Sequence, residues 1–217
     1  METLSLHVYK AIIMHRSFIL FTAISALFLT GCGTRDASTT ITFDEVISSR
    51  RSVRSYDASK TVSESEVREV LAAALEAPSW TNCEPSKYYV AMTPEKRDAA
   101  AKLVGERNEK SIKGAPVLII STFEKGKSGF VRGEQRNEIG DGWGAYDNGL
   151  NNAYLILKAR AMGFDTLIMG GRDSDALRGL FGIPENEEVM AVIALGYRAA
   201  DPDRPQRRSL DDVARFY

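Results

Sequence analysis

The pattern of apolar and polar positions divides the chain into a short apolar segment and a longer part where helical and strand-like patterns alternate. The run from Phe18 to Leu29 is almost entirely apolar, with basic residues before it and small, polar residues after it. It is shorter than the roughly 20 residues that a membrane-spanning helix needs. Its flanks are those of a signal peptide. We therefore expect residues 1–31 to be a signal peptide, with an uncleaved signal anchor as the alternative.

The tetrapeptide LTGC, which ends at Cys32, resembles the bacterial lipoprotein box, in which the cysteine is acylated and becomes the mature N-terminus. This resemblance makes Cys32 the lipidation site and residues 32–40 a short tether. Met14, which basic residues follow, is a more typical start for such a segment than Met1. The expected location is the bacterial cell envelope, on a membrane through the lipid anchor, and the alternative is the cytoplasm.

Residues 41–217 have the pattern of one domain, because the length suits a single core of ordinary size. Apolar spacing predicts helices at 42–49, 63–77, 94–104, 146–162 and 173–181, and strands at 87–92, 116–123, 165–169 and 188–197. Residues 125–143 are polar and rich in glycine, which is typical of a loop or flap. Helices that alternate with short strands predict an α/β domain.

Local signals support several of these boundaries. Ser63 and Glu66 have the spacing of a capping box, and Gly163 is placed to end the helix at 146–162. The continuous β-branched run at 116–123 favours a strand buried on both faces. In the helix at 146–162 the apolar residues share one face, and they are Leu150, Ala153, Tyr154, Leu157 and Ala161.

Histidine and cysteine usage narrows the chemistry. Both histidines lie within residues 1–31, so the mature domain would lack imidazole, which excludes Ser/His/Asp and Cys/His catalysis and any metal site that needs histidine. With Cys32 acylated, Cys83 is the single thiol left, which excludes an intrachain disulfide and a cysteine metal cluster. A net charge of −1 gives no reason to expect nucleic-acid binding. Carboxylates, lysines, tyrosines or a bound cofactor must carry the chemistry.

Arg50, Arg51 and Arg54 place three guanidiniums within five residues, with Ser52 between them. Arginine forks match phosphate oxygens, and a serine hydroxyl adds a donor, so the segment could be an anion site. A solvated basic turn is the alternative. A second basic group around Arg207 could meet the first only through the fold.

Two further segments have residues suited to a ligand. APSWTNCEP at 77–85 offers short polar groups that suit the edge of a flat heterocycle, although by itself it is only a loop. Gly170 and Gly171 follow a predicted strand, where backbone amides can approach a ligand closely; a plain tight turn is the alternative.

Five segments, taken together and in this order, resemble the FMN-dependent nitroreductase family over residues 41–217. They are RRSVRSY, APSWTNCEPSKYYV, GAPVLIIS, GLNNAYLILKARAMGFDTLIMGG and the arginine-bearing C-terminal stretch. The resemblance implies an α/β (α+β) fold with a central mixed β-sheet flanked by helices. It also implies an obligate homodimer that binds FMN at the subunit interface.

The resemblance assigns roles by position. Arg50, Ser52 and Arg54 would hold the FMN phosphate and the pyrimidine edge, Arg51 would add contacts, and Arg207 would complete the phosphate site. The residues that would contact the flavin bound mainly by the other subunit are Pro78, Ser79 and Asn82. Those that would face the isoalloxazine near N5 are Met169, Gly170 and Gly171.

The implied activity is hydride transfer by a ping-pong reaction at flavin N5, from NAD(P)H or another small-molecule donor to a nitroaromatic, quinone or similar acceptor. Two alternatives stay open: another flavin reaction such as reductive dehalogenation or dehydrogenation, and a flavin-binding lipoprotein without turnover. NAD(P)H is cytosolic, so an exported domain would need a different donor.

The chain departs from the family at Glu84, Pro85 and Ser86, where many members have Gln-Pro-Trp. A glutamate there is closer to the deiodinase and flavin-cleaving branches. The stretch at 104–115 is short for the deiodinase lid, which argues against that activity.

Acylation of Cys32 is testable by substitution. A Cys32→Ala protein should lose lipid labelling and membrane association, because the acyl chains are attached to that thiol and its amine. The measurement is incorporation of a labelled fatty acid together with membrane fractionation. Labelling equal to that of the parent would contradict the lipoprotein interpretation.

Overall fold

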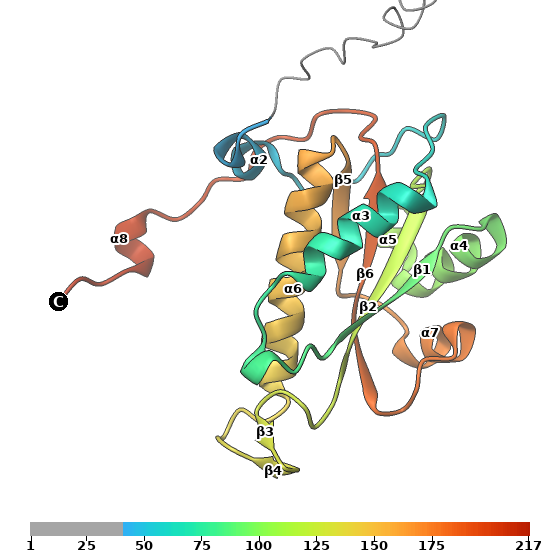
Figure 1. Cartoon of the computed structure of the whole chain (residues 1–217). Coiled ribbons are helices and arrows are strands. Elements are labelled where there is room, and N and C mark those ends of the chain that lie inside the picture. Colours follow the sequence, from blue (N-terminus) through green and yellow to red (C-terminus); the bar gives the residue numbers. More distant parts are fainter. Residues whose placement is uncertain (1–40) are drawn as a thin grey trace, which may run out of the picture. The chain divides into compact units, whose positions relative to one another are not determined.

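A four-stranded antiparallel sheet forms the centre of residues 41–217, the part of the chain that this computed structural model describes. Its order is β1 (Ser86–Ala91), β2 (Val117–Glu124), β6 (Glu187–Gly196) and β5 (Asp165–Met169) (Figure 1). The expectations for the signal peptide, Met14, Cys32 and the tether lie outside the described residues. The β-branched run predicted as a fully buried strand is the central strand β2, and its first seven residues are all buried.

The resemblance implied a mixed sheet, but the strand pairings β1–β2, β2–β6 and β5–β6 are all antiparallel. The parallel pairing among the described residues is an isolated bridge between Ser52 and Thr166, outside the named strands. This bridge adds the arginine segment to the free edge of β5. The phosphate-binding candidates are therefore fixed to the sheet itself.

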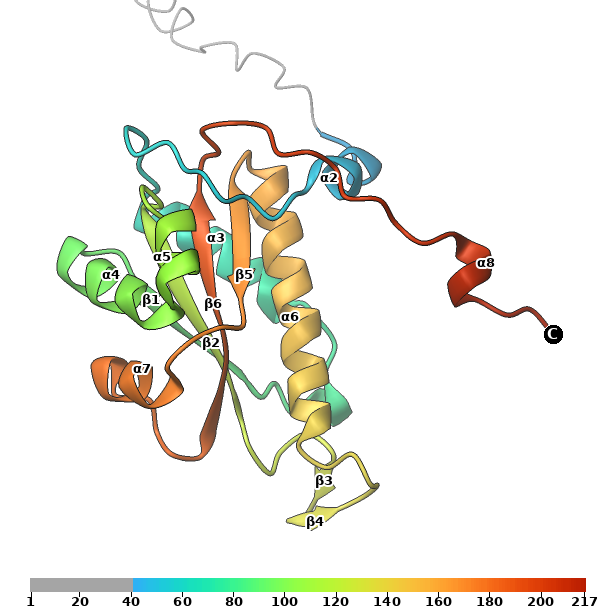
Figure 2. The ribbon, with the colours of Figure 1, turned by 180° about the vertical axis from the view of Figure 1, so that it is seen from behind.

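Helices cover both faces of the sheet, as Figures 1 and 2 show. On one face α3 (Glu64–Leu75) and α6 (Gly142–Ala161) pack through Val70 and Leu155 against Ile119 and Ile193. On the other face lie α4 (Pro94–Ala101), α5 (Glu106–Ser111) and α7 (Ser174–Phe181). There, Ala100 and Leu177 share a core with Leu118 and Val192. The sheet thus carries two apolar cores.

Helix ends agree with the local signals. The Ser63 hydroxyl accepts from Glu66 N at 3.3 Å, and the Glu66 carboxylate accepts from Ser63 N at 2.7 Å, which completes the predicted capping box. Gly163 follows α6 with φ +86°, a conformation that favours glycine. The expected short helix at 42–49 is α2 (Phe43–Ser49).

Several short elements were not predicted. They are α5, the 3-10 turn Trp80–Asn82, the hairpin of β3 (Phe130–Val131) and β4 (Glu134–Gln135) inside the expected flap, and α8 (Leu210–Val213). The helix expected at 94–104 divides into α4 and a 3-10 turn, Lys102–Val104. Short elements carry little periodicity, so their sequences resemble loops. In addition, α6 begins at Gly142, earlier than expected.

The first half of α6 turns polar residues inward. Asp147, Asn148, Asn151 and Asn152 are buried, whereas Tyr154 on the expected apolar face is 42% exposed. Further along the helix, Leu155 and Ala159 are buried in the apolar core. An amphipathic helix normally buries its apolar face, but here the hydrogen-bonded amides turn another face inward and leave Tyr154 exposed in a single chain.

The buried amides of α6 form hydrogen bonds to the sheet, and those of Asn148 are the most extensive. Asn148 Nδ2 donates to Ser86 Oγ at 3.1 Å and to Thr122 O at 3.0 Å. Its Oδ1 accepts from Ser121 Oγ and Asn152 Nδ2, both at 3.0 Å. These bonds repay the cost of burying amides, because each group exchanges water for a protein partner.

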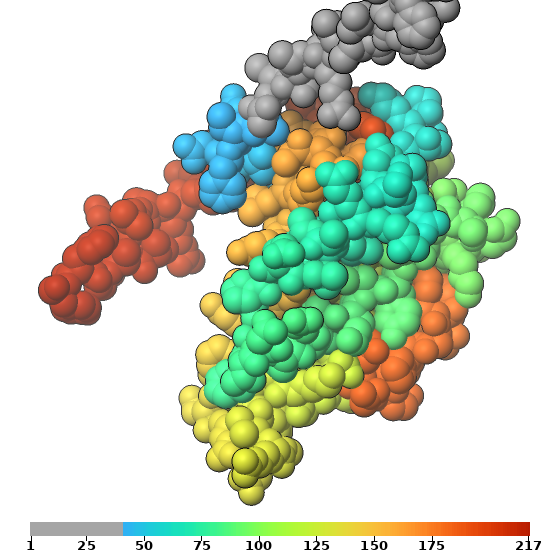
Figure 3. All heavy atoms as spheres, in the orientation of Figure 1, coloured from blue at the N-terminus to red at the C-terminus, as the bar shows by residue number. Residues whose placement is uncertain are grey.

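The chain ends in an exposed C-terminal arm, residues 199–217. It leaves the sheet after β6, passes α2 and carries α8 away from the core (Figures 1 and 3). Phe216 is 82% exposed, and Leu210 is 64% exposed.

Within residues 41–217 no helix has both the length and the apolar character needed to cross a membrane.

Loss of Asn148 should destabilise the fold strongly. Asn148→Ala should lower the free energy of unfolding by about 2 to 4 kcal/mol, because it leaves several buried donors and acceptors without partners. Urea unfolding followed by circular dichroism measures this change. Asn186→Ala is the control, since Asn186 is exposed and should change stability by no more than about 0.5 kcal/mol. Equal effects of the two substitutions would contradict the role given to the α6 amides.

Candidate functional site

The arginine segment, residues 50–56, runs across the end of the sheet where β5 begins and β6 ends. Val53 N donates to Thr166 O at 3.0 Å, and Tyr56 forms an antiparallel bridge with Arg198. Val53 and Tyr56 are buried, whereas Ser52 and Arg54 are exposed. This alternation anchors the segment through its apolar residues and turns the serine and an arginine outward.

Arg207 from the C-terminal arm lies close to Arg50, although the two are far apart in sequence. Partial burial and the positive charges of Arg207 and Arg51 together lower the pKa of the Arg50 guanidinium. The fold thus brings together the two basic groups that were recognised separately in the sequence. Mutual repulsion between these guanidiniums disfavours the arrangement unless an anion binds there.

No carboxylate of residues 41–217 forms an ion pair with this arginine cluster, which we define as Arg50, Arg51, Arg54 and Arg207. Instead, Arg51 Nη1 donates to Ser48 O at 2.7 Å, and Arg54 Nη1 donates to Ser52 O at 3.1 Å. Most of the donors in the cluster are therefore left for a ligand. A phosphate fits this set, because its oxygens accept several charge-assisted hydrogen bonds at once.

The predicted isoalloxazine contacts lie at the other end of β5. The Met169 side chain is 2% exposed and packs in the core, so only its backbone is available to a ligand. Gly170 and Gly171 are exposed, and a side chain at Gly170 would meet no atom within 4 Å. From Thr166 to Gly170 a strand advances about 13 Å, a separation compatible with a five-carbon ribityl chain between ring and phosphate.

The loop after α3 holds Pro78, Ser79 and Asn82 in a rigid conformation. Asn82 and Glu84 have positive φ values of 56° and 47°, which non-glycine residues rarely adopt. Ser79 Oγ accepts from Glu84 N at 3.0 Å, and Asp147 of α6 accepts from Trp80 N at 2.9 Å. Local strain that is held by such contacts often marks a ligand site.

Within one chain this loop is far from the arginine cluster. The loop bonds to α6 at Asp147, near its start, while Arg160 near the end of α6 bonds to Ser49, beside Arg50. Thirteen residues of helix separate Asp147 from Arg160, which corresponds to roughly 20 Å. The structure therefore joins the arginine cluster, Ser52 and β5 in one site, and it does not bring Pro78, Ser79 and Asn82 to that site.

Aromatic side chains gather beside the loop, a feature that the sequence analysis missed. The Trp80 and Trp143 ring centroids are 4.9 Å apart, and Tyr146 meets Trp143 edge-on at 5.6 Å. Trp80 Nε1 is buried and has no hydrogen-bond partner among residues 41–217. The available signal was that Trp80 lies within the polar segment 77–85 and Trp143 ends the polar segment 125–143.

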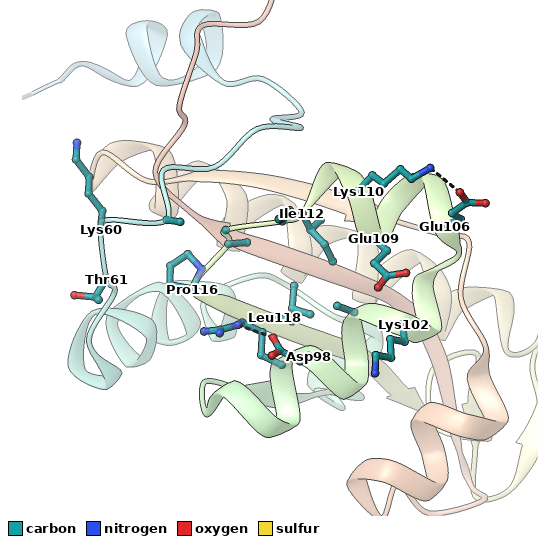
Figure 4. Close-up of a pocket in the computed structure, with 16 residues that line it drawn as sticks. Lys60, Thr61, Asp98, Lys102, Glu106, Glu109, Lys110, Ile112, Pro116 and Leu118 are labelled. Atoms are coloured by element: carbon teal, nitrogen blue, oxygen red, sulfur yellow. Dashed lines mark hydrogen bonds and ion pairs between the residues drawn. The ribbon is translucent and has the colours of Figure 1, made fainter.

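A separate groove lies elsewhere in this part of the molecule. This groove of about 710 Å³ runs between α4, α5 and the start of β2, and none of the predicted cofactor residues lines it (Figure 4). Two pairs of its charged groups are matched with each other: Lys110 with Glu106 at 2.6 Å and Arg97 with Asp98 at 3.5 Å. The arginine cluster instead lies on an open surface.

Comparison with known proteins gives a consistent result. The profile described as "Nitroreductase family" matches residues 47–197. The YdgI protein of Bacillus subtilis, named for a proposed NAD(P)H nitroreductase activity, is 25% identical over 203 residues that cover 80% of this chain and 97% of YdgI. An NADH dehydrogenase of Thermus thermophilus is 28% identical over 189 residues, covering 76% and 90% of the two chains.

Solved structures share the fold. A nitroreductase family protein from Streptococcus pneumoniae superposes with a TM-score of 0.71 at 22% identity, covering 81% of this chain and all of that one. A structure from Exiguobacterium sibiricum, determined in complex with FMN, superposes with a TM-score of 0.67 at 24% identity, covering 81% and 97%.

Proposed function

The chain belongs to the nitroreductase family, and on that premise we propose that it is an FMN-dependent oxidoreductase that reduces a flat aromatic acceptor. The observation that carries this proposal is the meeting of Arg50, Arg51 and Arg207 without a carboxylate partner. Such a cluster suits the dianionic phosphate of FMN. Bound FMN would supply hydride transfer between a reduced nicotinamide, or another donor, and the acceptor.

The protein's own residues would bind and orient the cofactor. Arg50, Arg51, Arg207 and the Ser52 hydroxyl would hold the phosphate end, and Arg54 would place a positive charge toward the polar edge of the ring. The exposed backbone at Gly170 and Gly171 allows a flat ring to approach the strand end closely. One structure of the same fold was determined in complex with FMN, which supports FMN as the cofactor.

The aromatic cluster of Trp80, Trp143 and Tyr146 favours a nitroaromatic or quinone acceptor. Stacked and edge-on rings bind flat π-systems, because a ring's positive edge meets another ring's negative face. The unpartnered Trp80 Nε1 could donate to an acceptor oxygen after a small shift. Release of halide from a halogenated substrate would instead indicate reductive dehalogenation.

We propose further that two copies of the chain share each flavin. Because the Pro78–Asn82 loop and the arginine cluster lie at opposite ends of α6, one flavin can contact both only if they come from different chains. The uncovered apolar face of α6 supplies an interface, with Tyr146 59% and Tyr154 42% exposed. Ile168 on β5 adds to this surface at 44% exposure. A face of this kind is suited to a two-fold, self-complementary contact.

A charge on this face should dissociate the dimer. Tyr154→Glu should raise the dimer dissociation constant by at least about a hundredfold, since an unpaired carboxylate would be buried between the two helices. Sedimentation velocity with the flavin absorbance recorded measures mass and FMN content together. Lys113→Glu, exposed on the opposite side of the sheet, is the control and should stay dimeric. A monomer that keeps stoichiometric FMN would contradict the shared site.

The arginine cluster is testable by FMN titration of the purified full-length chain. Arg207→Ala should weaken FMN binding by about tenfold to a hundredfold, because one charge-assisted hydrogen bond is lost. Arg54→Ala should also lower the reduction potential of bound FMN, since it removes a positive charge that favours added electrons. Arg215→Ala, exposed on the same C-terminal arm, is the matched control and should bind FMN as the parent does.

Parent-like FMN affinity in the Arg207→Ala and Arg54→Ala variants would mean that the phosphate lies elsewhere.

Reduction of the bound flavin with NADH and then NADPH, followed by addition of a quinone or nitroaromatic, tests turnover and identifies the donor. Flavin that stays oxidised with every donor would support a binding protein instead. Acylation of Cys32 and export, which we also propose, would require a donor other than cytosolic NAD(P)H.

A further inference from the structure

Asp165, the first residue of β5, is a buried carboxylate that accepts hydrogen bonds from two arginines. Its side chain is only 3% exposed. Arg198 donates to both carboxylate oxygens of Asp165: its Nε lies 2.7 Å from Oδ2, and its Nη2 donates to Oδ1. Arg160 of α6 approaches Oδ1 at 3.5 Å, and Arg198 N adds a bond to Oδ2 at 3.3 Å. Asp165, at the start of β5, is therefore a common acceptor for α6 and for the residue two positions after β6.

Both arginines extend from Asp165 to Ser49, the residue before Arg50. Arg160 Nε donates to Ser49 Oγ at 3.0 Å, and Arg198 Nη2 donates to Ser49 O at 3.4 Å. On the other side of Arg50, the Ser52–Thr166 bridge ties the segment to the neighbour of Asp165. The backbone that carries Arg50 is thus held at both ends by contacts centred on the start of β5.

The same arginine sets the course of the C-terminal arm. Arg198 Nη1 donates to Asp201 Oδ1 at 2.6 Å, and Ala199 N donates to Ser55 O at 2.9 Å. Beyond these contacts the arm is exposed, yet it returns Arg207 to the neighbourhood of Arg50. The direction in which the arm leaves the sheet depends on the orientation of Arg198.

We propose that Asp165 is the positioning residue for the phosphate end of the cofactor site. Its carboxylate orients Arg198 and Arg160, and these two side chains bring the segment with Arg50 and the arm with Arg207 to one place. Asp165 itself is buried beneath this arrangement and does not touch the phosphate. The inference depends on the proposed FMN site and adds a residue outside the set assigned to it.

Asp165→Asn tests the inference, because it keeps the shape of the side chain and removes the charge that holds the two guanidiniums. FMN and riboflavin differ only in the phosphate, so the ratio of their dissociation constants isolates the phosphate contacts. Asp165→Asn should weaken FMN binding by at least about tenfold, the equivalent of one charge-assisted hydrogen bond. Riboflavin affinity should stay within about twofold of the parent, since the ring contacts lie at the other end of β5.

Glu187→Gln is the matched control. Glu187 is a buried carboxylate on the adjacent strand, 5% exposed, and it accepts from the hydroxyls of Tyr89 and Thr122. It touches no member of the arginine cluster. Glu187→Gln should keep the parent ratio of FMN to riboflavin affinity even if it lowers stability.

Arg198→Lys provides a second test if Asp165→Asn fails to fold. Lysine keeps a positive charge beside Asp165 but cannot bond to Asp165, Ser49 and Asp201 together. It should therefore lose part of the preference for FMN over riboflavin, with the folded fraction checked by circular dichroism at saturating FMN. This variant then decides the question by itself.

The outcomes are distinguishable. A parent-like preference for FMN in Asp165→Asn, or in Arg198→Lys where that variant decides, overturns the inference and leaves the proposed function standing. Equal weakening of FMN and riboflavin shows a general structural role and also overturns it. A parent chain that binds FMN no better than riboflavin overturns both the inference and the proposed phosphate site.

Discussion

Asn148 and Asn152 lie side by side on the inner face of α6, where they hydrogen-bond to each other and to Ser121 at the centre of β2. This buried polar contact determines the rotation of α6 about its axis. Amides that lose water need partners in the protein, and the nearest partners are the hydroxyls and carbonyls of β1 and β2. The apolar stripe with Tyr146 and Tyr154 is then turned outward, where it stays uncovered within one chain.

Ser86 belongs to the same polar contact and explains the departure from the family pattern. Its hydroxyl donates to Asn151 Oδ1 and accepts from Asn148 Nδ2, both at 3.1 Å. A tryptophan, which many family members have at this position, would fill that space with a ring. In this chain the aromatic rings lie nearby instead, at Trp80 and Trp143. This chain therefore combines polar packing at the start of β1 with aromatic packing at the loop.

The length of α6 separates the ends of the candidate site. The Pro78–Asn82 loop is bonded to the start of the helix, and the arginine segment is bonded to its end. One chain alone presents the arginine cluster on an open surface and the Pro78–Asn82 loop at a distance from it. Burial of the α6 face between two chains would cover exposed apolar surface and bring the two parts together, so stability and cofactor binding would depend on the same contact.

Signals that act between residues close together in the chain predicted several helices and strands from the sequence alone. The capping box at Ser63, the glycine after α6 and the β-branched run of β2 each act within a few residues, so their patterns predicted the elements correctly. The order of motifs identified the family. The sequence could not show the inward rotation of α6, the meeting of Arg207 with Arg50, or the role of Asp165 between two arginines. These depend on contacts between residues that lie far apart in the chain, and only tertiary packing decides which distant polar groups find partners.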